Sequence, residues 1–382
     1  MDESIRRNEM INMKSYSNLW EKIISTDVIK LAIQSACKNI SGKKNKKKRN
    51  KLIEILTNIN EYIPTVRKWI EDFQPYKHTT RIINDGISAK QREIICPNVK
   101  EMIICHAVII VMKPLLTKGM YEHTYASIPK RGCHKGMKRI CKWIKKDPYN
   151  TKYCEKLDIK KFFPSISQDY LICKFKKVIR DEKFMNLLTN LIRTTEKGLP
   201  LGFFTSQWFA NYLLQELDHY IKEDLKVKYL IRFMDDMVLF GSNKRKLHKI
   251  RIKIEEKLSS MGLSLKENWQ IFKMHTLKGN GRFLDFMGFK FYRNKITMRK
   301  KICLKAMRKA KKISKKKNIT IYDARQMMTY IGWMKYTDSH NWYLNYIKPY
   351  VKIKKLKKII SDYDKRRKKL CGKNHNQQLC QS

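Results

Sequence analysis

The chain has 382 residues, which is long enough to bury a large hydrophobic core and predicts two or three lobes. Its N-terminus is polar, and its apolar stretches are too short or too interrupted to cross a bilayer. The sequence therefore argues against a secreted or membrane protein and indicates a soluble, cytoplasmic one.

The charge is strongly unbalanced, with 84 Lys and Arg against 34 Asp and Glu and a formal net charge of +50. A lysine-biased proteome contributes to this excess, but the acidic residues are too few to offset it. Basic surfaces attract phosphate backbones by releasing condensed counterions, so nucleic-acid binding is expected.

The ten cysteines show no C-x-x-C spacing. Cys371, His375 and Cys380 supply only three potential zinc ligands on a polar tail. Free thiols in a reducing compartment are expected rather than metal sites or disulfides.

The first part of the chain, to about Ile70, is predicted to form short helices interrupted by a basic run at Gly42–Arg49. Such a run is usually an exposed segment that touches phosphates without reading sequence. Turn residues alternate with short apolar pieces between Pro75 and Pro97 and predict a β-rich region. The apolar period of Val99–Leu116 predicts a helix that Pro114 closes.

The middle of the chain alternates strand and helix signals. A short strand is predicted at Tyr153–Ile159, and helical spacing follows over Leu171–Ile192. The segment Gly198–Gly202 breaks this helix, after which Thr205 or Ser206 is expected to cap a new one.

Two β-prone runs, Tyr229–Phe233 and Met237–Phe240, flank the acidic triplet Met234-Asp235-Asp236 and predict a hairpin with an acidic turn. Lys244–Ser260 is predicted to be a basic amphipathic helix that Gly262 stops. Two strand-like pieces follow, Leu263–Phe272 and Phe283–Tyr292. The region Lys300–Lys369 is predicted to be helical and basic, with interleaved aromatic residues. The order of elements is α+β with helical ends.

Three aspartates suggest a metal-dependent reaction. Nucleotidyl transfer uses two divalent cations about 3.5–4 Å apart, and Mg²⁺ prefers carboxylate oxygens. Asp158 ends a predicted strand, and Asp235 and Asp236 lie in the hairpin turn. An Asp-Asp pair alone is usually a solvated turn. Here both flanks are apolar and β-prone, so the carboxylates are expected in a folded sheet, where a cation would offset the cost of burial.

Four segments resemble motifs of bacterial reverse transcriptases and occur in that family's order and at its spacing. Leu157–Ile166 resembles the first palm motif, and Gly198–Gln207 resembles the loop that contacts template and nucleotide. Arg232–Asp236 resembles the Tyr/Phe-x-Asp-Asp motif, and Phe283–Phe289 resembles the primer-grip strands. The resemblance spans roughly Lys77 to Tyr346.

The resemblance implies an α+β, right-hand polymerase fold with fingers, a palm of antiparallel sheet packed on helices, and a helical thumb. The expected divisions are a basic N-terminal extension (residues 1–75), fingers (76–152), palm (153–295), thumb (296–370) and a polar tail (371–382). Helices near residues 170–195 are assigned to the fingers.

It also implies the roles of individual residues. Asp158 and Asp235 match the principal metal ligands, Asp236 is the second member of the dyad, and the backbone carbonyl of Ile159 completes the shell of one ion. The implied cofactor is a pair of Mg²⁺ ions, for which Mn²⁺ can substitute. Phe163 matches the bulky side chain under the incoming sugar, which blocks a 2′-hydroxyl and selects dNTPs.

Five further residues are expected at the nucleotide. Lys90 and Arg92 match the fingers residues that clamp the triphosphate through charge-assisted contacts. Leu201, Gly202 and Gln207 belong to the loop that contacts nucleotide and template.

The loop reads Pro200-Leu201-Gly202 and ends in Ser206-Gln207, where most group II intron and retron enzymes read Pro-Gln-Gly and Ser-Pro. It resembles the reverse transcriptases of diversity-generating retroelements. Segments similar to that subgroup's fingers and thumb motifs are His123–Ala126 with Lys130–Lys135, and Tyr330–Tyr336 with Asp338–His340.

Leu201 offers only van der Waals contact where glutamine could form hydrogen bonds, so mispairs should be rejected less strongly. The subgroup's misincorporation opposite template adenines is assigned to Leu201 as a hypothesis. Phe203, Phe204 and Met234 depart from the subgroup's pattern.

Three alternatives stay open: a retron-like or antiviral-defence reverse transcriptase, a catalytically silent RNA-binding scaffold, and an RNA-dependent RNA polymerase, which Phe163 disfavours. The implied partners are a template RNA, the RNA/cDNA duplex, dNTPs and a small basic accessory variability protein, with no membrane partner.

Overall fold

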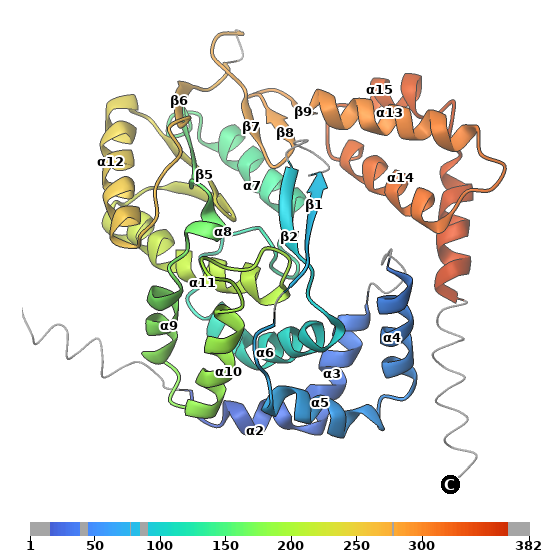
Figure 1. The fold of residues 1–382 in the computed structure, drawn as a ribbon. Coiled ribbons are helices and arrows are strands. Elements are labelled where there is room, and N and C mark those ends of the chain that lie inside the picture. The colour runs from blue at the N-terminus through green and yellow to red at the C-terminus, as the bar shows by residue number, and fades with distance from the viewer. Residues whose placement is uncertain (1–15, 39–44, 77, 85–90, 277–278, 366–382) are drawn as a thin grey trace, which may run out of the picture.

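The computed structural model describes residues 16–38, 45–76, 78–84, 91–276 and 279–365. Within these ranges helices predominate and surround a four-stranded antiparallel sheet, which is accompanied by two smaller antiparallel sheets (Figure 1). This mixture of helices and antiparallel strands confirms the α+β class expected from the sequence.

The central sheet has the strand order β4-β5-β3-β6. Its strands are β3 (Tyr153–Asp158), β4 (Tyr229–Phe233), β5 (Asp236–Gly241) and β6 (Gln270–Lys273). The strand at Tyr153 and the β4–β5 hairpin confirm the sequence predictions.

Both faces of this sheet are covered. The covering helices are α7 (Cys133–Lys146), α11 (Phe204–His219) and α12 (Lys244–Ser260), and α6 (Val99–Thr117) packs against α11. Side chains alternate along β5, so Met237 and Leu239 join the core that contains buried residues of α6, α11 and α12. Val238 and Phe240 join a second core with α7.

Four helices come before this body: α2 (Leu19–Ile24), α3 (Thr26–Cys37), α4 (Lys46–Thr57) and α5 (Tyr62–Glu71). They contact α6, and their buried residues belong to the same core as the sheet. The expectation that the basic run interrupts the helices was wrong for residues 46–49, which form the first turn of α4, although Lys46 and Lys47 are exposed as expected. The helix forms because Leu52 and Ile55 are fully buried and Asn45 caps it, accepting a hydrogen bond from the Lys48 amide at 3.1 Å. Residues 42–44 lie outside the described ranges.

The predicted β-rich region is an antiparallel hairpin of β1 (Thr80–Asn84) and β2 (Gln91–Ile95). The helix predicted after it is α6, but Pro114 lies inside this helix and does not close it. The helix continues to Thr117 because the Pro114 carbonyl still accepts a hydrogen bond from the Lys118 amide at 3.1 Å.

The single helix predicted over residues 171–192 is two helices, α9 (Gln168–Lys176) and α10 (Glu182–Ile192). Asp181 starts the second by accepting a hydrogen bond from the Phe184 amide at 3.1 Å. Neither Thr205 nor Ser206 caps α11, whose N-cap residue is Phe203. The Ser206 hydroxyl is buried and donates to the Pro200 carbonyl at 2.7 Å instead.

The two strand-like pieces after α12 are shorter than predicted. The first retains only β6, and the second is a hairpin of β7 (Leu284–Phe286) and β8 (Phe289–Phe291). Met287 and Gly288 form its two-residue turn and both have positive φ, which is the geometry that tight hairpins favour. A third short strand, β9 (Ile296–Met298), pairs with β8.

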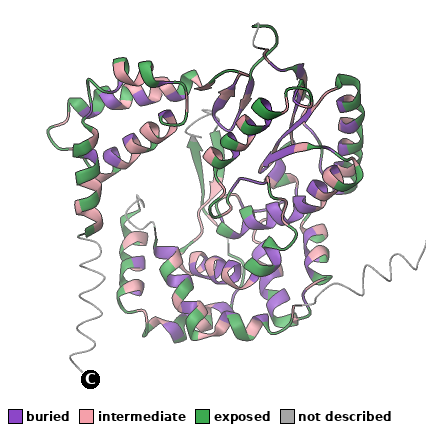
Figure 2. Ribbon diagram, turned by 180° about the vertical axis from the view of Figure 1, so that it is seen from behind, coloured by how far each residue is buried: buried purple, intermediate pink, exposed green. Residues whose placement is uncertain are grey.

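The C-terminal part is helical, as predicted, with α13 (Lys300–Ser314), α14 (Ile321–Met334), α15 (His340–Tyr346) and a helix over residues 353–365. It has an apolar core of its own. Figure 2 shows that its helices bury a narrow inner face, while their other residues are intermediate or exposed. Trp333 joins it to the second core by stacking on Phe289 with ring centroids 4.7 Å apart.

None of the described helices is long and apolar enough to cross a membrane. The eight cysteines in the described ranges are all free thiols, as expected. Cys371 and Cys380 lie outside these ranges.

Candidate active site

The strand register brings the predicted aspartates together. Asp158 is the last residue of β3 and pairs directly with Asp236, the first residue of β5. Both side chains therefore lie on the same face of the sheet, because opposite residues of antiparallel strands share a face. Asp235 lies directly before Asp236, in the turn between β4 and β5 that the pairing of Phe233 with Asp236 closes.

The turn holds Asp235 through an unusual backbone conformation. It contains only Met234 and Asp235, and Met234 has a left-handed φ of 59°. The Asp235 carbonyl accepts a hydrogen bond from the Ile159 amide at 3.4 Å. This bond places the backbone of Ile159, the residue directly after β3, beside the acidic turn.

The electrostatics of this cluster are unfavourable without a cation. Burial, followed by repulsion from Asp236 and Asp158, raises the pKa of Asp235 to about 6. Burial also raises the pKa of Asp236, and nearby Lys156 opposes this shift. Partly buried carboxylates that repel one another are the donor set that a hard divalent cation would stabilise.

Lys266 is already placed against this cluster. Its amide donates to the Asp158 carbonyl at 2.8 Å, and its ammonium group forms an ion pair with Asp158 Oδ1. Across the residues that the structure describes, no three His, Cys, Asp or Glu side chains are arranged as a ready metal site. The carboxylates nevertheless fit a divalent cation, because a cationic group already contacts one of them.

The loop after α10 is anchored by backbone hydrogen bonds at two points, Phe163 and the end of β2. The Leu199 amide donates to the Phe163 carbonyl at 2.9 Å, and the Ile95 amide donates to the Leu201 carbonyl at 2.8 Å. Phe163 is half-buried and belongs to a short helix, α8 (Phe162–Ser165), five residues after Asp158. The structure thus joins β2, α8 and the loop.

Gly202 is required where the loop meets β2. Its φ is +125°, and a Cβ at this position would overlap the carbonyl oxygen of Ile95. Next to it lies a cavity of about 350 Å³, partly lined by Lys48, His106, Phe204 and Gln207. Phe204 is 38% exposed and stacks on His106 with ring centroids 4.2 Å apart.

Of the two predicted triphosphate contacts, the structure describes Arg92. Arg92 is exposed on β2, opposite Ile83 in the hairpin register. Lys90 lies outside the described residues.

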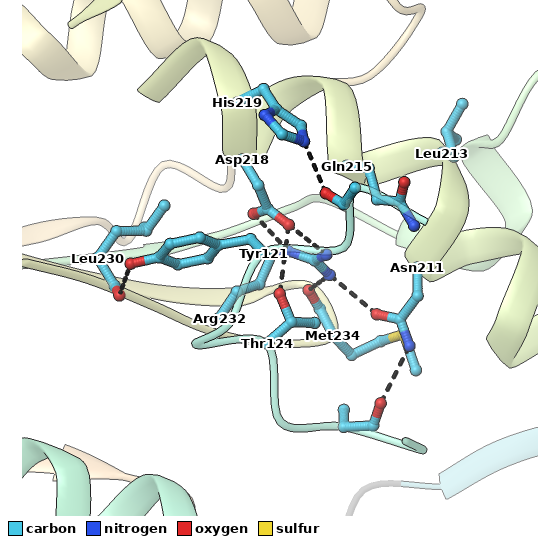
Figure 3. A network of polar contacts seen from close by, with 12 residues as sticks. Tyr121, Thr124, Asn211, Leu213, Gln215, Asp218, His219, Leu230, Arg232 and Met234 are labelled. Carbon is cyan, nitrogen blue, oxygen red and sulfur yellow. Dashed lines mark hydrogen bonds and ion pairs between the residues drawn. The ribbon is translucent and has the colours of Figure 1, made fainter. Parts of the chain in front are cut away.

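Sequence reasoning missed a buried ion pair directly behind the acidic turn. Arg232 is fully buried, and its Nε and Nη2 atoms donate to the two carboxylate oxygens of Asp218 at 2.8 and 2.6 Å (Figure 3). Its Nη1 atom donates to Asn211 Oδ1 at 3.0 Å and to the Met234 carbonyl at 3.1 Å. A signal was available, since an arginine inside a buried strand requires an acidic partner. Asp218 lies on the same face of α11 as the buried polar residues Asn211 and Gln215, which recur at helical spacing.

Comparison with known proteins gives one family. The family model described as "Reverse transcriptase (RNA-dependent DNA polymerase)" matches residues 77–291, which are more than half of the chain.

The similar curated proteins include the retron Ec73 reverse transcriptase of Escherichia coli, 26% identical over 34% of this chain and 45% of the relative. Protein YkfC of Escherichia coli strain K12 is 24% identical over 36% of this chain and 39% of its own length. The chain therefore spans less than half the length of these relatives. Among solved structures, apo telomerase from Candida tropicalis has a TM-score of 0.47 and 13% identity, over 71% of this chain and 57% of that chain.

Proposed function

The chain belongs to the reverse transcriptase family, and we propose that it is an RNA-directed DNA polymerase that copies a template RNA into cDNA from dNTPs. The observation that carries the proposal is the register pairing of Asp158 with Asp236, with Asp235 in the adjoining turn. Family membership accords with the right-hand, α+β architecture expected from the sequence, and it implies dependence on divalent metal ions.

We assign the metal-binding role to Asp158, Asp235, Asp236 and the carbonyl of Ile159. Two Mg²⁺ ions, or Mn²⁺ in their place, would activate the primer 3′-hydroxyl and neutralise the triphosphate. The strand register places the carboxylates of Asp158 and Asp236 on one face of the sheet. Lys266 forms an ion pair with Asp158 in the metal-free protein, and a bound cation would supply the positive charge in its place.

The nucleotide-binding residues form a second part of the proposal. Phe163 excludes a 2′-hydroxyl, and Lys90 and Arg92 bind the triphosphate. Leu201, Gly202 and Gln207 contact the nucleotide and the template. The support for the loop is its anchoring to Phe163 and Ile95, which keeps Leu201 close to α8.

We also propose the division into lobes expected from the sequence, with fingers, palm and thumb at residues 76–152, 153–295 and 296–370. The separate apolar core of the C-terminal helices supports the last boundary. Residues 1–75 are less distinct than an extension would be, because the described helices in this range share the main core.

Within the family we propose a diversity-generating role, with misincorporation opposite template adenines and a basic accessory variability protein as partner. The support is the aliphatic Leu201 in the nucleotide loop. A retron-like enzyme is the second candidate, and similarity to the retron Ec73 reverse transcriptase favours it.

The first test is primer extension on poly(rA)/oligo(dT) with Mg²⁺ or Mn²⁺. Wild type is expected to extend the primer and Asp235→Ala to be inactive. Asp169→Ala is the matched control, because the Asp169 side chain is 85% exposed and forms its ion pair with Arg193 rather than with a site residue. Equal activity of wild type and Asp235→Ala would refute the assigned site.

The subgroup is tested by sequencing cDNA made from a defined RNA that contains adenines. Errors concentrated at adenines support the diversity-generating role, whereas faithful cDNA supports the retron-like one. Absence of cDNA, even with the flanking RNA and accessory protein added, supports a catalytically silent RNA-binding scaffold.

A further inference from the structure

We infer that Arg232 is a positioning residue that, together with Asp218, fixes the acidic turn in the conformation needed to bind metal. The inference rests on the proposed function, because it concerns how Asp235 is held rather than what Asp235 does. None of the side-chain hydrogen bonds of Arg232 described above goes to Asp235, to Asp236 or to a proposed nucleotide-binding residue. It acts through the backbone of Met234.

The contact with Met234 is the key geometric observation. Met234 has a φ of 59°, a conformation that is costly for a residue with a Cβ atom. Its carbonyl accepts a hydrogen bond from Arg232 Nη1 at 3.1 Å (Figure 3). The next residue in the chain is Asp235. This charge-assisted bond therefore stabilises a strained peptide immediately before a proposed metal ligand.

The guanidinium group is itself held rigidly. Asp218 binds it through both carboxylate oxygens, and Asn211 Oδ1 accepts a third hydrogen bond, from Nη1. The side chains of Arg232 and Asp218 are both fully buried. A planar fork held in this way can direct Nη1 at one carbonyl, which a flexible lysine ammonium cannot do.

The network extends to the segment His123–Ala126, which the sequence singled out and to which the proposed function gave no role. Thr124 donates to Asp218 at 3.3 Å, and Asn211 donates to the Ala126 carbonyl at 3.0 Å. Thr124 also lies beside Arg232 as a short parallel bridge, in which the Arg232 amide donates to His123. This segment therefore supports the acidic turn from behind.

Fold stability alone does not account for this arrangement. Buried ion pairs can often be replaced by apolar residues without loss of stability, so a pair of this kind contributes little to the fold by itself. What apolar residues cannot replace is the donor aimed at the Met234 carbonyl. The structure thus assigns the pair a role in the geometry of the turn.

The test uses the full-length, metal-free protein and two variants. Arg232→Lys keeps a charge beside Asp218 but lacks the fork. The double variant Arg232→Met with Asp218→Asn removes both charges, so that no lone buried ion prevents folding. Glu216→Gln is the matched control: it lies two residues from Asp218 on α11, and it loses ion pairs with Lys174 and Lys257 that do not reach the turn.

Two readouts are compared. Hydrogen exchange of peptides that cover Phe233–Met237 reports the turn directly, and titration with Mn²⁺ alone, followed by the signal of the free ion, reports metal affinity. Both Arg232 variants are expected to exchange about tenfold faster in the turn and to bind Mn²⁺ about tenfold more weakly, with the β3 peptides unchanged. Glu216→Gln is expected to match wild type in both readouts.

Folded Arg232 variants whose turn exchanges at the wild-type rate would overturn the inference. So would an acceleration spread evenly over β3, β4 and β5, because that is the result of a purely structural role. Failure of the proposed function gives a different pattern, in which wild type makes no cDNA while the exchange difference in the turn persists.

Discussion

Replacing Asp235 by asparagine is expected to stabilise the metal-free protein while abolishing polymerase activity. Burial and the nearby charges of Asp236 and Asp158 raise the pKa of Asp235 to about 6, against an ordinary value of 3.8. The ionised carboxylate is therefore unfavourable in the folded, metal-free chain. Asparagine keeps the shape of the side chain and removes the charge.

The size and pH dependence of the effect follow from this pKa difference. A folded-state pKa above the unfolded one means that the folded state is favoured at low pH and loses stability as the pH rises from 3.8 to about 6. At pH 8 the full difference corresponds to about 3 kcal/mol as an upper value. At pH 5 about 1.5 kcal/mol remains. For a chain of this size, 3 kcal/mol is about 4 °C in Tm.

The assay is thermal unfolding in EDTA at pH 8 and pH 5, for wild type, Asp235→Asn and the exposed control Asp169→Asn. Asp235→Asn should melt above wild type at pH 8 and by a smaller margin at pH 5, and Asp169→Asn should follow wild type. Added Mn²⁺ should raise the Tm of wild type but not of Asp235→Asn. A variant that is less stable than wild type at pH 8, or one whose gain is the same at both pH values, would refute the reasoning.

Three further outcomes test the nucleotide-binding residues. Phe163→Val should raise the ratio of ribonucleotide to deoxynucleotide incorporation at least about tenfold, measured as kcat/KM for each, because the steric block is smaller. Leu201→Gln should lower misincorporation opposite template adenines, and an unchanged error rate in sequenced cDNA would contradict the role of Leu201. Gly202→Ala should lower the free energy of unfolding by about 1–3 kcal/mol and impair primer extension, because its Cβ meets Ile95. Gly332→Ala, with open space around it, should not destabilise in a urea titration.

Sequence patterns correctly predicted the elements that are specified by residues close together in the chain. The apolar period of α6, the β-prone runs on either side of Asp235-Asp236 and the glycine after α12 each specify their structure within a few residues. The wrong predictions concern segments whose structure depends on contacts with residues far away in the chain or in the folded loop. The basic run in α4 is helical because Leu52 and Ile55 pack into a core formed largely by later segments. The expected capping role of Ser206 failed because its hydroxyl bonds to Pro200 in the folded loop.

The sequence by itself determined the chemistry available to this protein: three aspartates in β-prone surroundings, a basic surface, and motifs in the order of the reverse transcriptase family. Only the tertiary structure decided how these residues meet. The register of β3 against β5 sets Asp158 opposite Asp236, and the fold brings Arg232 to Asp218 and Lys266 to Asp158. Strand register and the pairing of buried charges depend on contacts between segments far apart in the chain, so a pattern within one segment does not specify them.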